Sequence, residues 1–143
     1  MFFKSKKDLF HKLITVFLLL ILTLVLFFSW TEKAVNLDYK IGLSFLIVAI
    51  GGGLIWMYIF TFYTLTEKEI QCTTGPFKKN ISIESIQKLE ITKNYNLQNS
   101  YWATATKGIL IYYNQSNTIY ISPEFDQNFI KNLVKINPDI QIS

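Results

Sequence analysis

Side chains able to carry out nucleophilic or metal chemistry are few and widely separated in this sequence. His11 is the only histidine and Cys72 the only cysteine among the 143 residues. A Cys–His pair would require the chain to fold back on itself, and a zinc site of the usual type has too few ligands. Cys72 has no His or second Cys nearby, so we interpret it as a small packing residue rather than a reactive thiol.

Four carboxylates in the second half of the chain are the remaining candidates for catalysis: Glu84, Glu90, Glu124 and Asp126. Two of them could act as an acid and a base if the fold brought them together. Carboxylates at this density normally form a solvated face, however, and no phosphate-binding loop accompanies them. The sequence therefore predicts a protein that is not an enzyme, with no catalytic, cofactor-binding or metal-binding residues and no cofactor.

The net charge of +4 arises at the start of the chain, where Lys4, Lys6, Lys7 and Lys12 face only Asp8. All fourteen basic residues are lysines, so the planar guanidinium fork that reads base edges and clamps phosphates is absent. From residue 64 onward the lysines and the acids nearly balance. We therefore expect no nucleic-acid partner.

Two long uncharged apolar segments, at residues 13–31 and 41–63, must position whatever follows them. A helix that crosses a bilayer core needs about 20 such residues. A cleaved signal peptide is the alternative for the first segment, but its apolar core exceeds the usual length of about 7–15 residues, and residues 31–34 lack a small-x-small cleavage pattern. The sequence predicts two transmembrane helices joined by an external loop at residues 32–40.

Lysine placement predicts the orientation of this hairpin. Four lysines precede the first segment and three follow the second within sixteen residues, whereas the loop has two. Cytoplasmic flanks carry the excess of lysine, so both termini are expected in the cytoplasm, with residues 1–12 as a basic N-terminus at the cell membrane. Tyr63, at the end of the second segment, is expected at the membrane–water interface.

A glycine triplet, Gly51 to Gly53, lies inside the second apolar segment. It could form a hinge that lines a translocation route, or it could let the two helices approach closely. Neither segment contains Asp, Glu, Lys, Arg or His, and such residues are the usual mark of a translocation route. We favour packing of the hairpin through Ala49, Gly51, Gly52 and Gly53, with Ala49 and Gly53 as a small-xxx-small pair.

Residues 64–143 have the pattern of a small domain. Strand-like runs recur at residues 63–66, 69–73, 80–83, 86–92, 109–113 and 118–121, with the short connections of antiparallel hairpins. A polar segment, residues 94–107, interrupts them. Ser122 and Pro123 are placed to start a final amphipathic helix that ends at Asn137-Pro138. The predicted fold class is α+β: a two-helix transmembrane hairpin followed by an antiparallel β-roll closed by a C-terminal helix.

Several short motifs in this domain resemble the bacterial PH-like family often called YyaB-like. They are Thr-Gly-Pro-Phe at 74–77, the spacing of Ile81, Ile83 and Ile86, Ile-Leu-Ile-Tyr-Tyr at 109–113, Ile-Tyr-Ile-Ser-Pro at 119–123, and Asn137-Pro138. The similarity covers roughly residues 64–140. It implies a PH-like β-roll or barrel behind two membrane helices. Residues 103–108 lack the Asp-Arg pair that the family carries before its fifth strand, which removes any ligand contact made through that pair.

The resemblance implies a membrane-anchored PH-like interaction module at the cytoplasmic face, and the family includes bacteriocin self-immunity proteins. Tyr101 and Trp102, with Lys78 and Lys79, are expected to contact a protein or peptide partner. The competing interpretation of Trp102 is a core residue. The alternative function is an anionic-lipid sensor or scaffold that uses the N-terminal lysines, which also serve as topology signals. The sequence does not define the oligomeric state.

Overall fold

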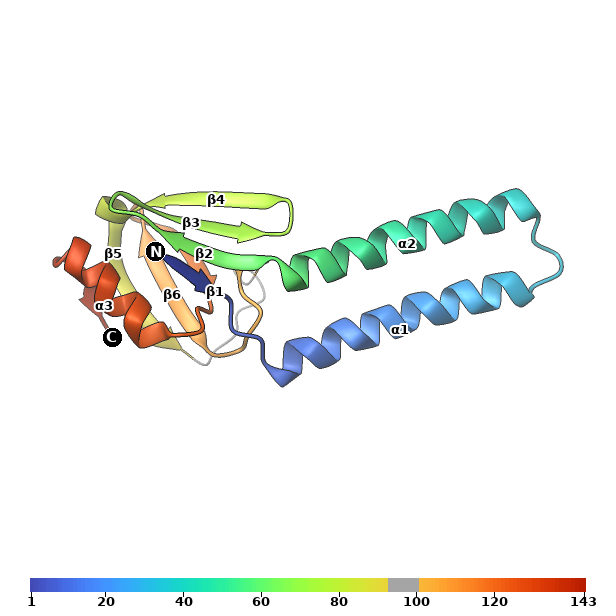
Figure 1. The fold of residues 1–143 in the computed structure, drawn as a ribbon, viewed down its shortest axis with the longest axis horizontal. Coiled ribbons are helices and arrows are strands. Elements are labelled where there is room, and N and C mark those ends of the chain that lie inside the picture. Colours follow the sequence, from blue (N-terminus) through green and yellow to red (C-terminus); the bar gives the residue numbers. More distant parts are fainter. Residues whose placement is uncertain (93–100) are drawn as a thin grey trace.

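Two long helices project from one end of a small β-domain in the computed structural model of this chain (Figure 1). The structure describes residues 1–92 and 101–143. In chain order the elements are β1 (Phe2–Lys4), α1 (Leu9–Thr31), α2 (Leu37–Ile59), β2 (Thr61–Leu65), β3 (Glu69–Thr74), β4 (Phe77–Ser82), the 3-10 helix η1 (Ile83–Ser85), β5 (Ile86–Thr92), β6 (Gly108–Tyr113), β7 (Asn117–Ile121), α3 (Asp126–Ile136) and β8 (Gln141–Ile142). The predicted α+β class is confirmed. Residues 93–100, which overlap the polar segment expected at 94–107, lie outside the described residues.

Helices α1 and α2 are each 23 residues long, about 35 Å of helix. Both are long and apolar enough to cross a membrane by length and composition. Helix α1 buries no residue, and α2 buries only Ile47 and Gly51, so most of their large apolar side chains are exposed. Such a surface is unfavourable in water and favourable in lipid.

The helix bounds differ from the predicted 13–31 and 41–63. Each helix begins earlier, because the side chains of Asp8 and Asn36 accept hydrogen bonds from the backbone N–H groups of His11 and Tyr39 and so cap the first turns. Those first turns include polar residues, which an apolar pattern does not detect. Helix α2 also ends earlier, because the residues after Phe60 join the sheet as β2.

The hairpin closes along one stripe of buried and half-buried residues on each helix, at the spacing of three and four residues typical of packed helices. The stripe on α1 is Thr15, Leu19, Leu22, Leu26 and Ser29, and the stripe on α2 is Ser44, Ile47, Gly51, Leu54 and Tyr58. At the far end the Trp30 indole N–H donates to Ser44 Oγ at 3.0 Å, and the Lys40 amine donates to the carbonyl oxygen of Glu32 at 2.7 Å.

Only one of the four small residues expected at the hairpin contact lies there. A Cβ at Gly51 would meet Leu19 Cδ2 at 3.5 Å, whereas a Cβ at Gly52 or Gly53 would meet nothing within 4 Å, and Ala49 is exposed. A helix turns by about 100° per residue, so Ala49 and Gly53 lie on the opposite side of α2 from Gly51. The expected Ala49–Gly53 pair is therefore not the contact between α1 and α2.

The β-domain consists of two four-stranded sheets with strand orders β1-β2-β3-β4 and β7-β6-β5-β8. All pairings are antiparallel except that of β5 with β8. The largest fully buried side chains fill the space between the sheets and beneath α3: Tyr63, Tyr120, Phe129, Ile70, Ile81, Ile83, Leu89, Ile109, Ile111, Ile119, Ile121 and Leu133. Tyr63 therefore belongs to the core and not to a membrane interface.

Strand β1 is the main departure from the expected organisation. Residues 1–12 were expected as a separate basic segment, but Phe2, Phe3 and Lys4 pair with Thr64, Tyr63 and Phe62 of β2. The two ends of the helical hairpin thus enter adjacent strands of one sheet (Figure 1). The folded domain includes residues 1–8 and 61–63 in addition to the expected 64–143.

Helix α3 begins at Asp126, four residues after the expected cap at Ser122. Phe125 precedes it and makes no side-chain cap hydrogen bond. The hydroxyl of Ser122 is instead buried beside β1, where it bonds to other side chains. The apolar face expected for this helix is present, with Phe129, Ile130 and Leu133 buried.

Candidate functional site

A buried hydroxyl network lies where the two helices join the domain. Ser5 Oγ lies 3.0 Å from Tyr63 Oη, 3.0 Å from Ser122 Oγ and 2.8 Å from Thr104 Oγ1. The N–H of Ser122 donates to Tyr63 Oη at 3.0 Å, and the Tyr63 hydroxyl donates to the carbonyl oxygen of Trp102. Buried hydroxyls joined in this way fix one arrangement of the segments that carry them.

Burial raises the pKa of Tyr63 to about 12, although the hydrogen bonds from Ser122 and Ser5 oppose the shift. Tyr63 is thus neutral near pH 7. Burial likewise raises the pKa of the Cys72 thiol to about 12, against a smaller opposing effect of Lys79. The thiol is therefore protonated and enclosed, in agreement with a packing residue.

Asp8 joins the start of α1 to the segment before β6. Its carboxylate accepts hydrogen bonds from the N–H and the hydroxyl of Thr106, both at 2.6 Å, and from the N–H of His11 at 3.0 Å. The His11 ring nitrogen Nδ1 lies 2.8 Å from the same carboxylate. Burial opposes ionisation, but these hydrogen bonds outweigh it and hold the pKa of Asp8 well below its usual range. Asp8 is thus a fixed anion that anchors α1 to the domain.

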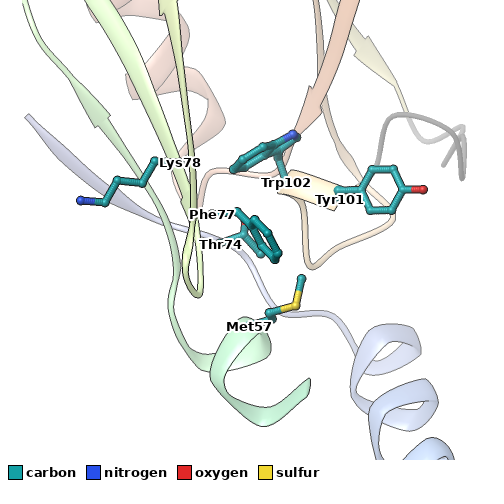
Figure 2. Close-up of a pocket in the computed structure, with 6 residues that line it drawn as sticks. All are labelled: Met57, Thr74, Phe77, Lys78, Tyr101 and Trp102. Carbon is teal, nitrogen blue, oxygen red and sulfur yellow. The ribbon is translucent and has the colours of Figure 1, made fainter. Parts of the chain in front are cut away.

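An open cavity of about 320 Å³ lies beside this junction, between α2 and the tip of the β3–β4 hairpin. It is lined by Met57, Thr74, Phe77, Lys78, Tyr101 and Trp102, and we call it the Trp102 pocket. Figure 2 shows Met57, Phe77 and Trp102 directed toward one space, while the Lys78 amine and the Tyr101 hydroxyl extend outward on opposite sides. The pocket is thus largely apolar, with polar groups at its rim.

Short-range contacts hold the walls of the Trp102 pocket in place. Gly75 adopts a φ of +54° at the tip of the β3–β4 hairpin, and a Cβ there would lie 3.0 Å from Met57 Cγ and 3.3 Å from Met57 Cα. The Gly75 N–H donates to the carbonyl oxygen of Phe60 at 2.9 Å. The Thr61 hydroxyl donates to the carbonyl oxygen of Met57 at 2.6 Å. Only glycine permits this close approach of the turn to α2.

The structure brings three of the four expected contact residues together. Lys78, Tyr101 and Trp102 line the Trp102 pocket, and Tyr101 is 73% exposed. Trp102 also packs against the core, so it has both of the roles considered for it. Lys79 points elsewhere, because neighbours along a strand face opposite sides, and its amine lies 5.6 Å from the centre of the Tyr113 ring.

Met57 and Phe77 are wall residues that the sequence analysis did not identify. Met57 lies in the apolar segment that was predicted to be the second transmembrane helix. No sequence pattern indicated that the last turn of this helix contacts the domain. Phe77, 58% exposed, could have been found from its place directly after the Gly75-Pro76 turn. An exposed aromatic residue at a hairpin tip is a common contact residue.

The four carboxylates considered for catalysis lie in different surroundings, with Asp126 in the first turn of α3. Glu90 accepts a hydrogen bond from the Tyr112 hydroxyl at 2.9 Å, and this bond raises the pKa of Tyr112. Glu84 lines a separate cavity near the end of α3, and Glu124 lies beside β1. Within residues 1–92 and 101–143, no three His, Cys, Asp or Glu side chains are grouped to hold a metal ion.

Comparison with known protein families matches residues 61–137 to the family described as Bacterial PH domain. The match covers more than half of the chain. It begins at the first residue of β2, so it leaves out β1, Ser5, Asp8 and the helical hairpin. No curated protein and no solved structure matches the chain significantly.

Proposed function

Because the chain belongs to the bacterial PH domain family, we propose that it is a non-enzymatic interaction module anchored in the cell membrane. In this proposal α1 and α2 cross the bilayer, and the β-domain binds a protein or peptide partner at the cytoplasmic face. The N-terminal strand and the domain lie on one side of the membrane, since β1 and β2 are hydrogen-bonded neighbours. The lysine excess at that end of the hairpin favours the cytoplasmic side.

The Trp102 pocket is the observation that carries this proposal. Its walls are apolar, its rim carries one amine and one phenol, and it adjoins Met57 in the last turn of α2. Exposed aromatic side chains around an open apolar cavity are typical of the centre of a binding surface. More than half of the surface of Phe77 and of Tyr101 is exposed, so this surface is available for contact with a partner.

An apolar side chain of an amphipathic peptide is the occupant that we favour. The pocket lies beside the end of a helix that the proposal places in lipid, so a peptide at the membrane surface could reach it without leaving that surface. The sharper form of the proposal is bacteriocin self-immunity, in which the domain binds such a peptide toxin, or its target, and thereby protects the producing cell. This form rests on the family resemblance and on the position of the pocket.

The proposal is tested by site-specific photo-cross-linking in cells that express the full-length chain. A photoreactive phenylalanine analogue at Tyr101 should capture a peptide or protein, whereas the same analogue at Phe125 should not. Phe125 is a matched control because it is 65% exposed and lies outside the Trp102 pocket. Equal capture at both positions, or capture of lipid alone at Tyr101, would contradict a peptide-binding pocket.

The immunity form has its own test. Expression of the chain should raise tolerance to at least one membrane-active peptide toxin in a panel, and Phe77→Ala with Tyr101→Ala should remove that protection. The variant Phe125→Ala should retain it. Unchanged sensitivity across the panel, with the protein present in the membrane, would exclude immunity to those toxins. It would not contradict the proposal that the domain is an interaction module.

A further inference from the structure

A second concave surface lies where β1 and β2 meet the last turn of α2. This cavity has a volume of about 850 Å³, and we call it the lysine cavity. Its lining combines three lysines with apolar side chains and a few polar groups: Phe2, Lys4, Ser5, Lys6, Lys7, Ile59, Phe60, Thr61, Phe62 and Glu124. It shares no lining residue with the Trp102 pocket.

Strand alternation places the side chains of Lys4 and Lys6 on the side of this cavity. Side chains of successive residues in an extended chain point to opposite faces. Phe3 and Ser5 face the core, where the Phe3 ring lies 5.1 Å from that of Phe129 and Ser5 joins the hydroxyl network. Lys4 and Lys6 therefore face the other side. The Lys6 N–H donates to the carbonyl oxygen of Ser122 at 2.6 Å, which fixes this arrangement.

Lys7 places a third amine at the end of α2. Its Nζ lies 3.5 Å from the carbonyl oxygen of Ile59 and 4.9 Å from the centre of the Tyr58 ring. Ile59 and Phe60, which form the apolar part of the lining there, are 51% and 53% exposed. The cavity thus continues directly into the apolar surface of a helix that is long enough to cross a membrane.

The positive charge of the lysine cavity is not neutralised by the described part of the chain. No ion pair joins Lys4, Lys6 or Lys7 to a carboxylate in residues 1–92 and 101–143. Glu124 is the one acid in the lining, and the Asp8 carboxylate, which accepts hydrogen bonds from Thr106 and His11, does not line the cavity. Three amines against one carboxylate leave a net positive site.

We propose that the lysine cavity binds an anionic phospholipid of the membrane in which the hairpin is embedded. Its ammonium groups would hold the phosphate, and the acyl chains would lie along the exposed face of Ile59 and Phe60. Amines close to an anionic leaflet each contribute about fivefold in affinity, so three give roughly 100-fold. This inference depends on the membrane anchor but not on a peptide in the Trp102 pocket.

The test is a lipid titration of the full-length chain in neutral detergent micelles, read by native mass spectrometry. The wild type should bind phosphatidylglycerol roughly 100-fold more tightly than phosphatidylcholine. The triple variant Lys4→Gln, Lys6→Gln, Lys7→Gln should lose this preference. A control with the same loss of charge, Lys68→Gln, Lys107→Gln, Lys131→Gln, should keep it, because these exposed lysines lie outside the cavity.

Two further measurements complete the test. The variant Glu124→Gln removes the one acid of the lining and should raise affinity for phosphatidylglycerol about fivefold, a gain that does not arise from misfolding. Soluble glycerol phosphate should not displace the lipid, because it lacks the acyl chains. Equal binding of the two lipids by the wild type, an unchanged preference in the triple variant, or displacement by glycerol phosphate would overturn the proposal.

Discussion

Replacement of Tyr63 by phenylalanine tests whether the buried hydroxyl network holds the helical hairpin to the domain. The substitution keeps the ring, which is fully buried in the core, and removes only the oxygen. That oxygen accepts from the N–H of Ser122 at 3.0 Å, donates to the carbonyl oxygen of Trp102 and lies 3.0 Å from Ser5 Oγ. The variant therefore leaves the buried N–H of Ser122 and the part-buried carbonyl oxygen of Trp102 without their side-chain partner.

The expected loss of stability follows from those two groups. A buried polar group left without a partner costs about 1–3 kcal/mol, and the part-buried carbonyl of Trp102 costs less than the buried N–H of Ser122, so the two together give about 2–4 kcal/mol. A domain of this size is stable by about 5–15 kcal/mol, so the loss is a large fraction of the total. The control Tyr112→Phe removes a bond to Glu90 near the surface and should cost less than about 1 kcal/mol.

Cys72 provides the assay, because it is the only cysteine, is fully buried and lies opposite Tyr63 in the β2–β3 register. A thiol reagent reaches it only when the domain opens, so its labelling rate in full-length protein in detergent reports the free energy of opening. Tyr63→Phe should raise this rate roughly 30- to 700-fold. A rate within about twofold of the wild type, or an equal rise in Tyr112→Phe, would refute the assigned role of the network.

Three other predictions concern the junction of hairpin and domain. The pKa of Asp8 is lower in the folded than in the unfolded chain, so its contribution to stability is present at neutral pH and is lost as the pH falls below about 4. The melting temperature of Asp8→Asn should therefore vary less with pH in that range than the melting temperature of the wild type. Gly75→Ala should speed Cys72 labelling about tenfold, through the positive φ and the contact with Met57, whereas Gly52→Ala should leave it unchanged. The hairpin can be replaced by a loop of about five residues that joins residues 1–8 to residues 61–143. This shortened protein should be soluble and show cooperative unfolding by circular dichroism. Residues 61–143 alone should not, because they lack β1, Ser5 and Asp8.

The elements with a regular apolar pattern could be predicted from the sequence. The two helices of the hairpin, most strands of the roll and the apolar face of α3 follow from long apolar segments, alternation and helical spacing. The starts of α1 and α2 were predicted less accurately, because the capping residues Asp8 and Asn36 lie in polar segments next to the apolar runs. The start of α3 was misplaced because Ser122 has the residue type of a cap but its hydroxyl is used by Ser5.

Strand β1 and the junction depend on contacts between residues far apart in the chain. The first residues alternate as a strand does, with Phe3 and Ser5 on one side and Lys4 and Lys6 on the other, but a short lysine-rich segment before a membrane helix also fits a topology signal. Its partner, β2, lies about 60 residues later in the chain. Tyr101 and Trp102 could be named from the sequence as candidate contact residues by type, whereas Met57 joins them in lining the Trp102 pocket only through the close approach of Gly75 to α2.

Cysteine labelling in intact cells tests most directly whether the hairpin spans the membrane with the domain in the cytoplasm. Ala34→Cys lies in the short connection between α1 and α2, and Ser116→Cys lies in the exposed turn between β6 and β7. The buried Cys72 contributes little background, because its thiol pKa is raised to about 12. A membrane-impermeant maleimide should label Ala34→Cys in intact cells and Ser116→Cys only after the membrane is opened. Labelling of Ser116→Cys in intact cells, or of neither position until the cells are opened, would contradict this topology.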